Sequence, residues 1–512
     1  MGDIRNILFV TFDQWRGDCL SAMGHPVIET PVLDALAADG VLFRNHFTNT
    51  APCGPARASL FTGLYPMLHR SVRNGTPLDA RHTNLALEAR KAGFEPVLFG
   101  YTDSSADPRG LAPADPRLQG YEELLPGMEE VLRHATAREE WEAWLARKGH
   151  DFPHGIGFNW LPDRDGFEDD PYAAAPGRLP LEDWDTRFMT DRALQYIEGR
   201  GAKPWFVHLS YWPPHPPFVA PAPYHKRYDR ADVPAPHRAA SPQEEAAQHP
   251  WLRYALAHHE RYSWCYGTET SPADMTDEEM AQIRATYYGM INEVEDCLGQ
   301  ILTYLKQTGQ YDHTLIVLTS DHGEMLGDHW LLGKMGYFDE AYHVPLIIRD
   351  PREQAVRGRM VEMMTEAVDI APTLLDLIGL DVPRVMHGRS LRPWIEGQTP
   401  ADWRDFVMWE YDFRDVRDGK IETALGLTLE TANLAVLRDR TSKYVHFSGL
   451  PPLYFDLQDD PEERHNRAAD PACQARVLEA AQRLLSHRMG HAERTLTHIT
   501  LDGGYAEADW AL

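Results

Sequence analysis

The sequence predicts an α/β protein whose large unit has a mostly parallel central sheet flanked by helices, followed by a smaller α+β unit. Short apolar runs alternate with helical patterns along most of the chain, which is typical of parallel strands joined by crossover helices. From about residue 401 the pattern changes to closely spaced strands and one final helix. We therefore expect a large unit over 1–400, with an insertion at about 103–200, and a smaller unit with an antiparallel sheet over 401–512.

Strands are predicted where short apolar runs follow one another without a helical period, because such runs suit strands that are covered on both faces. In the large unit these runs are Ile7–Phe12, Val97–Gly100, Trp205–Leu209 and Leu315–Thr319. In the small unit the antiparallel strands are Phe406–Tyr411, Leu434–Arg438 and Lys443–Phe447, followed by a helix over about Pro471–Met489.

One long helix is predicted between the last two strands of the large unit. Thr276 and Glu279 form a capping box, and apolar residues then recur every three or four positions over Ile283–Leu305. A second helix is predicted within the insertion, at about Glu129–Lys148. Six prolines over Pro213–Pro223 predict an extended loop directly after a strand.

Charge and composition exclude several classes of protein. The 512 residues carry 50 basic against 77 acidic side chains, a formal charge of −27, which argues against a nucleic-acid binder or an anionic-membrane binder. No apolar run approaches the ~20 residues of a membrane span, and the first run is too short for a secretory signal. Five scattered cysteines predict no disulfide framework, so we expect a cytoplasmic protein.

Polar side chains follow each predicted strand of the large unit at the point where the strand ends. Ligands of open α/β sheets bind just outside these carboxyl ends, and carboxylate, amide and imidazole groups together suit a divalent cation. From spacing alone, a turn or cap role for these residues remains equally open. The groups are Asp13-Gln14, Tyr101-Thr102-Asp103, His215 and Asp321-His322.

A short helix is predicted to begin at Cys53, because Pro55 suits a first helical turn and Gly63 suits a helix end. Arg57 lies one turn later, on the same face as Cys53. A cysteine at a helix N-terminus has a lowered pKa and acts as a thiolate nucleophile, or it is a small buried capping residue. The thiolate alternative fits poorly here, because a thiolate is mismatched to a hard cation with oxygen ligands.

The segment Cys53-Gly54-Pro55-Ala56-Arg57 followed by Ala58-Ser59-Leu60-Phe61-Thr62-Gly63 resembles the signature of the sulfatases of the alkaline phosphatase superfamily. Four further motifs occur in the family's order along nearly the whole chain. They are Asp13 after a strand, Pro214-His215-Pro216-Pro217-Phe218, Ser320-Asp321-His322-Gly323-Glu324 with Gly333-Lys334, and Leu453-Tyr454-Phe455-Asp456-Leu457.

Within this family the chain most resembles phosphonate monoester hydrolases. Asp13-Gln14 stands where many sulfatases have Asp-Asp, and Asp321-His322 where they have Asp-Asn. The subgroup tends to have Thr where this chain has Asp103, so Asp103 departs from the pattern. Further matching segments are Asp13-Gln14-Trp15-Arg16, Pro77-Leu78-Asp79-Ala80-Arg81-His82, Gly100-Tyr101-Thr102 and Asp107-Pro108-Arg109.

The resemblance implies a nucleophile made by oxidising Cys53 to formylglycine, whose hydrated aldehyde attacks phosphorus or sulfur in an ester. It also implies one divalent cation, expected to be Mn with Ca, Zn or Mg as alternatives. The expected metal ligands are Asp13, Gln14, Asp321, His322 and the modified Cys53. Arg57, Lys334 and His215 are expected to act in catalysis, with Asn74, Tyr101 and Thr102 contacting substrate oxygens.

Charge favours esters with a single negative charge. Two carboxylate ligands leave a divalent site near neutral, and Arg57 and Lys334 make the pocket positive. We therefore expect hydrolysis of phosphonate monoesters and phosphodiesters, and of sulfate monoesters as well. The alternatives are a dedicated sulfatase, and a non-catalytic anion-binding relative with unmodified Cys53. The expected partners are a small anionic ester, a formylglycine-generating maturation enzyme and, from the resemblance, further copies in a homotetramer joined by C-terminal segments.

Overall fold

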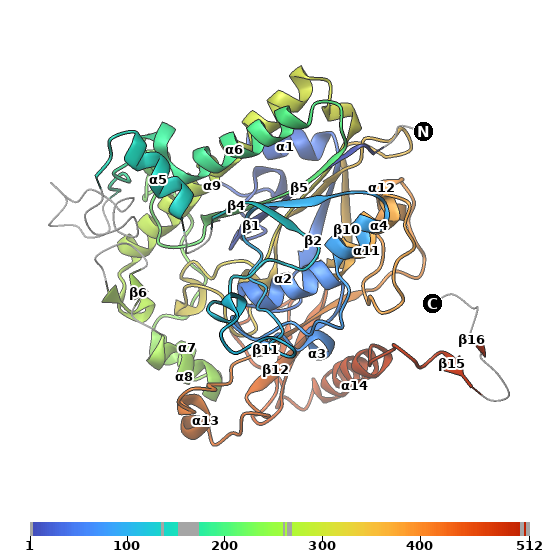
Figure 1. Ribbon diagram of the computed structural model, residues 1–512. Helices are drawn as coiled ribbons and strands as arrows, with labels where there is room; N and C mark the ends of the chain where they lie inside the picture. Colours follow the sequence, from blue (N-terminus) through green and yellow to red (C-terminus); the bar gives the residue numbers. More distant parts are fainter. Residues whose placement is uncertain are drawn as a thin grey trace.

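A large sheet of eight strands forms the centre of the molecule, in the order β10-β2-β9-β8-β1-β5-β3-β4 (Figure 1). The computed structural model describes residues 4–134, 138–151, 174–259, 262–263, 269–501 and 506–507. All neighbouring strands of the sheet are parallel except for β9, which runs antiparallel to β2 and β8. The strands are β1 (Asn6–Asp13), β2 (Val41–Phe47), β3 (Pro96–Gly100), β4 (Glu129–Arg133), β5 (Trp205–Pro214), β8 (Thr314–Ser320), β9 (Leu346–Arg349) and β10 (Arg359–Glu366).

Helices cover both faces of this sheet, because alternate residues of its strands are apolar and point to opposite sides. Leu8 and Val10 of β1 lie in one core with α1, α6 and α9, and Ile7 and Phe9 lie in the other with α2, α4 and α11 (Figure 1). The helices are α1 (Pro31–Ala38), α2 (Cys53–Thr62), α3 (Pro66–His69), α4 (Leu85–Lys91), α5 (Glu139–Arg147), α6 (Asp185–Arg200), α7 (Pro242–Ala246), α8 (Pro250–His258), α9 (Asp277–Gln307), α10 (Asp339–Tyr342), α11 (Ile370–Leu377) and α12 (Arg392–Ile395).

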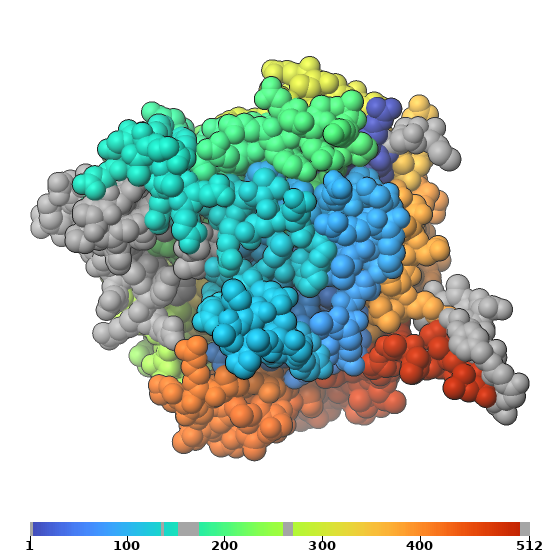
Figure 2. Space-filling model, viewed as in Figure 1, coloured from blue at the N-terminus to red at the C-terminus, as the bar shows by residue number. Residues whose placement is uncertain are grey.

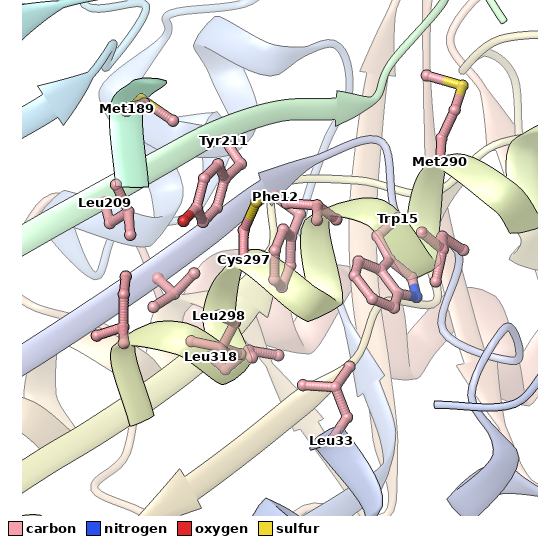
Figure 3. Close-up of a cluster of buried hydrophobic side chains, with 14 of the residues drawn as sticks. Phe12, Trp15, Leu33, Met189, Leu209, Tyr211, Met290, Cys297, Leu298 and Leu318 are labelled. Atoms are coloured by element: carbon pink, nitrogen blue, oxygen red, sulfur yellow. The ribbon is translucent and has the colours of Figure 1, made fainter. Parts of the chain in front are cut away.

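The long helix predicted from the capping box is α9. Thr276 accepts a hydrogen bond from the backbone N–H of Glu279, and the Glu279 carboxylate accepts one from the backbone N–H of Thr276. Its apolar face packs on the sheet, and Figure 3 shows Cys297 beside Phe12 and Tyr211, whose rings stack with centroids 5.9 Å apart. The strong helical period therefore predicted this element correctly.

The C-terminal unit contains an antiparallel sheet, as the sequence predicted, but with a fourth strand, Leu453–Asp456, in addition to the three predicted ones. Its strands are joined in chain order, and the residues of this unit, coloured orange to red, cover the lower side of the molecule in Figure 2. The elements are β11 (Phe406–Asp412), α13 (Lys420–Leu425), β12 (Asn433–Asp439), β13 (Ser442–Phe447), β14 (Leu453–Asp456) and α14 (Gln474–Gly490). Two short pairs remain: β6 (Tyr262–Ser263) with β7 (Glu269–Thr270), and β15 (Ile499–Thr500) with β16 (Ala506–Glu507).

Hydrogen bonds join the C-terminal sheet to the loop that precedes Cys53 in the sequence. The backbone N–H of Glu410 in β11 donates to the carbonyl of Asn49 at 2.9 Å. The Asn49 amide donates in turn to the carbonyl of Met408 at 2.9 Å, and Thr50 forms an isolated bridge with Glu410. The loop that leads into α2 is therefore held by the C-terminal sheet.

The helix predicted at Glu129–Lys148 is wrong in its first part. Glu129–Arg133 forms β4, which pairs in parallel with β3, and only Glu139–Arg147 is helical. The hydrogen bonds gained at the edge of the sheet outweigh the helical preference of the Glu, Leu and Arg residues in this stretch. Of the predicted insertion at 103–200, residues 135–137 and 152–173 lie outside the described residues, as do 502–505 and 508–512 of the tail.

Among the described residues, no helix has the length and apolar content needed to cross a membrane. Cys19, Cys53, Cys297 and Cys473 are free and buried. The division into 1–400 and 401–512 stays a prediction.

Candidate active site

Asp13 and Asp321 meet at the carboxyl edge of the large sheet because their strands are parallel neighbours. Phe12 of β1 pairs with Ser320 of β8, so the two aspartates follow at the same level. Gln14 takes a left-handed conformation with φ of 70°, and its backbone N–H donates to Oδ1 of Asp321 at 3.1 Å. This turn directs the side chains of Asp13, Gln14 and Asp321 toward one point.

Cys53 lies at the first position of α2, after Pro52, and the helix ends at Gly63, whose φ of 65° is favourable for glycine. Its Sγ atom lies 3.7 Å from Oδ1 of Asp13 and 3.2 Å from Nε2 of His322. The sequence-predicted nucleophile is thus in contact with two sequence-predicted metal ligands.

Four buried groups, from Asp13, Cys53, Asp321 and His322, place ligand atoms within 4.8 Å of one another. His322 donates from Nδ1 to the carbonyl of Gly323 at 3.0 Å, which leaves the lone pair of Nε2 facing the cluster. Carboxylate oxygens and a neutral imidazole are ligands for a divalent cation.

The thiol of Cys53 is not activated by its place at the helix N-terminus. Burial raises the pKa of Cys53 well above its usual value, and the carboxylate of Asp13 raises it further. The lowered pKa expected from the helix position is therefore wrong, because only 4% of Cys53 is exposed and its neighbours are acidic.

Burial and a shared site also perturb the two aspartates. Burial, and then the charge of Asp13, raises the pKa of Asp321 to about 7. Burial opposes the charge of Asp13 as well, but its interactions with His215, Lys334, His322 and Arg57 hold its pKa below the usual range. Two carboxylates in one buried site resist full ionisation, and a cation between them would remove this cost.

Arg57 is fully buried and joins the acids of the site. Its Nε donates to Oδ2 of Asp321 at 2.9 Å, and Nη2 lies 3.4 Å from Oδ2 of Asp13. Nη1 donates to the carbonyl of Tyr101 at 2.9 Å and to the Ser210 hydroxyl at 2.7 Å. Ser210, which the sequence did not single out, thus fixes the guanidinium.

Glu324 is a second residue whose role was missed. It is fully buried, and one oxygen accepts from the backbone N–H groups of Leu326 and Gly333 at 3.0 and 2.5 Å. Its other oxygen accepts from Nε2 of Gln14, so Oε1 of Gln14 points to Lys334, whose Nζ donates to it at 2.6 Å. Its position one residue after Asp321-His322-Gly323 was the only signal in the sequence.

The three candidate substrate contacts, Asn74, Tyr101 and Thr102, have different partners in the structure. Asn74 accepts from the backbone N–H of Gly54 at 2.9 Å and lines the site cavity. Tyr101 donates its hydroxyl to Oδ2 of Asp13 at 2.6 Å. The Thr102 hydroxyl donates to the carbonyl of Glu123 and accepts from the N–H of Leu125, so it holds the loop and does not line the cavity.

His215 lines the same cavity at the end of β5. Its Nδ1 lies 2.6 Å from the carbonyl of Pro216, which places the proton on Nδ1 and leaves Nε2 as an acceptor. Burial, and then the charge of Lys334, lowers the pKa of His215 to about 3. A bound anion would favour the protonated ring, and with it the predicted role as proton donor.

A cavity of about 720 Å³ opens from this site, with Gln14, Asn74, His215 and Lys334 on its inner wall. The C-terminal unit supplies part of its outer wall through Tyr411, which the sequence analysis did not anticipate. A larger cavity of about 930 Å³ between residues 382–406 and α14 contains none of the predicted site residues.

Comparison with known proteins agrees with this geometry. Residues 5–380 match the profile of the sulfatase family, and residues 327–490 match that of the C-terminal region of N-sulphoglucosamine sulphohydrolase. The chain is 46% identical over 500 residues to the multifunctional alkaline phosphatase superfamily protein PehA of Trinickia caryophylli, which covers 96% of this chain and 97% of that protein. An arylsulfatase of Clostridium perfringens is 26% identical over 492 residues, 90% of this chain and 89% of the relative.

Two solved structures share the fold over almost their whole length. The phosphonate monoester hydrolase of Agrobacterium radiobacter has a TM-score of 0.94 and 47% identity, with 98% of this chain and 99% of that chain covered. The phosphonate monoester hydrolase of Silicibacter pomeroyi has a TM-score of 0.91 and 41% identity, with the same coverage. From the family profile, these similarities and the Cys53 site together, the chain belongs to the sulfatase family of the alkaline phosphatase superfamily.

Proposed function

We propose that this protein hydrolyses phosphonate monoesters and phosphodiesters that carry one negative charge, and sulfate monoesters as further substrates. The observation that carries the proposal is the buried cluster of Asp13, Cys53, Asp321 and His322, whose ligand atoms lie within 4.8 Å of one another. Similarity to two phosphonate monoester hydrolases over 98% of the chain supports the choice of substrate class.

The donor set fits one divalent cation held by Asp13, Gln14, Asp321 and His322, with the modified Cys53 as a further ligand. Two carboxylates, an amide oxygen and one imidazole suit Mn best, although Ca, Mg and Zn also bind such ligands. When bound, the ion supplies positive charge to the reacting oxygens.

Catalysis in this proposal starts from formylglycine at position 53, which a separate maturation enzyme forms. When formed, the hydrated aldehyde would supply two hydroxyls. One would displace the alcohol from phosphorus, and loss of the proton from the other would release the phosphonate. Water therefore does not have to attack phosphorus, which distinguishes this route from one that uses serine.

The side chains around position 53 bind and orient the reactants. Arg57, fixed by Asp321 and Ser210, holds the hydroxyls of residue 53 and offsets developing negative charge. Lys334 lies on the cavity wall, where it contacts a substrate oxygen. His215, protonated when the anion is bound, gives its proton to the departing oxygen.

The charge of the site separates the substrates. Asp13 and Asp321 neutralise the divalent ion, which leaves Arg57 and Lys334 to bind one negative charge. A dedicated arylsulfatase is the main alternative, and the arylsulfatase relative keeps it open. Turnover of one aryl alcohol esterified to phosphonate, phosphodiester, sulfate and phosphate decides between them, and a phosphate monoester as best substrate would contradict the proposal.

The first experiment is the mass of the tryptic peptide that contains Cys53, purified from the native host. Conversion to the aldehyde lowers the mass by about 18 Da. An unmodified thiol would remove the proposed nucleophile and favour the non-catalytic, anion-binding alternative.

We also propose a cytoplasmic homotetramer. Leu478, Leu485 and Met489 of α14 are 59–70% exposed on one helix, and Leu496 and Leu501 continue this apolar surface at 69% and 75%. Figure 1 shows the segment after α14 extending away from the body. Such a surface suits contact with further copies of the chain, and size measurement in solution tests it.

A further inference from the structure

The inner end of the site cavity lies next to the cluster, and Pro52, which directly precedes Cys53, is part of its lining. Gln14, Asn74, His215 and Lys334 line it, whereas Cys53, Arg57 and the two aspartates do not. Cys53 lies behind this wall, at 4% exposure. A molecule in the cavity therefore reaches the site past Asn74, His215 and Lys334, beside the start of α2.

Aromatic side chains form the outer part of the cavity. Trp251 of α8 lies with its ring centroid 6.1 Å from that of Tyr411, in an edge-on arrangement, and 6.2 Å from that of Phe413. Tyr254 and Ile421 continue the lining, and α8 contacts α13 next to them (Figure 1). The wall is thus built jointly by α8 and the C-terminal unit.

The charged side chains of the cavity lie near its inner end or are held by an ion pair or a hydrogen bond. Asp412 is bound by Arg414 at 2.7 Å, and the Arg73 guanidinium donates to the carbonyl of Arg414 at 3.1 Å. Lys334 and His215 face the cluster. The aromatic region between these groups suits an apolar ring, because edge and face contacts between rings add to the burial of apolar surface.

In an in-line displacement the departing oxygen lies on the side of phosphorus away from the nucleophile, and His215, its proposed proton donor, lines the cavity. We propose that Trp251, Tyr411 and Phe413 form the subsite that binds an aromatic alcohol as the leaving group, a proposal that rests on the proposed function. The protein then selects aryl esters over small alkyl esters, while the phosphorus centre stays at the metal cluster.

Truncation of Phe413 tests the subsite through its effect on two esters of methylphosphonate. With the 2-naphthyl ester, kcat/KM of Phe413→Ala should fall about 10–100-fold relative to wild type. With the trifluoroethyl ester, whose alcohol does not reach the aromatic wall, the change should stay below about threefold. Phe413→Leu should restore most of the loss, and Phe406→Ala, at the first position of β11 and outside the cavity, is the matched control.

Binding of 2-naphthol gives a readout that does not depend on turnover. Wild-type metal-loaded protein should bind it in a titration, and Phe413→Ala should weaken binding about tenfold or more. Equal losses for both esters, or unchanged naphthol binding, would overturn the subsite. Absence of all ester hydrolysis would count against the proposed function, and naphthol binding would then still decide the subsite.

Discussion

Replacement of Glu324 by Gln tests whether a buried carboxylate fixes the orientation of a proposed metal ligand. In the structure one Glu324 oxygen accepts two backbone N–H groups, and the other accepts from Nε2 of Gln14. In Glu324→Gln the amide oxygen must stay with the two N–H groups. Its new NH₂ group then faces Nε2 of Gln14, so two donors oppose each other.

The Gln14 amide can avoid this repulsion only if its oxygen and nitrogen exchange places. Its NH₂ group would then lie 2.6 Å from the ammonium of Lys334, and its oxygen would no longer face the cluster. An unpaired buried donor costs about 1–3 kcal/mol. We therefore expect metal affinity to fall about 10–100-fold, or about 1.4–2.7 kcal/mol.

Competition with a chelator measures this affinity directly, and kcat/KM against Mn concentration gives a second reading. Glu410→Gln is the control, because Glu410 is buried in β11 and pairs with Arg488 outside the cluster. An unchanged metal dissociation constant in Glu324→Gln would refute the orientation argument.

Three further changes probe other features. Arg57→Met leaves Asp13 and Asp321 without their buried cation. The free energy of unfolding should therefore fall by about 3–5 kcal/mol, and kcat/KM should fall about 10²–10³-fold. A fully active variant would contradict this expectation. Gly63→Ala forces a φ of 65° on alanine and brings Cβ to 3.2 Å from Met386, so denaturant unfolding should show a loss of about 1–2 kcal/mol. Burial raises the pKa of Glu293 from 4.5 to about 7, so wild-type stability should decrease as pH rises between these values and stay level above. Glu293→Gln should remove this decrease. Relative to wild type, the variant should therefore gain up to about 3 kcal/mol of unfolding free energy between pH 5 and pH 8, measured by thermal unfolding. An unchanged pH profile would contradict this expectation.

Local sequence patterns predicted the elements whose conformation is decided by residues near one another in the sequence. The period and capping box of α9 identified the helix, and Pro55 with Gly63 identified the limits of α2. Glu129–Arg133 was misassigned because pairing with β3 decides its conformation, and no local pattern reports that pairing.

The site shows the same division. Asp13 and Asp321 could be expected to meet, because strand ends of a parallel sheet lie at one edge. Ser210 and Glu324 could not be assigned roles, since each acts through a neighbour distant in sequence. The aromatic wall at Phe413 depends on how the C-terminal unit packs against α8, which only the folded chain determines.

The hydrogen bonds between Asn49 and the C-terminal sheet have a consequence for the order of events during synthesis. Asn49 and Thr50 find their partners only when Met408 and Glu410 have been made, 357 residues after Cys53 (410 minus 53). At about 5–20 residues per second, the ribosome needs roughly 20–70 s for this length. For that interval the loop before Cys53 lacks these contacts, so the thiol would be open to the maturation enzyme proposed above.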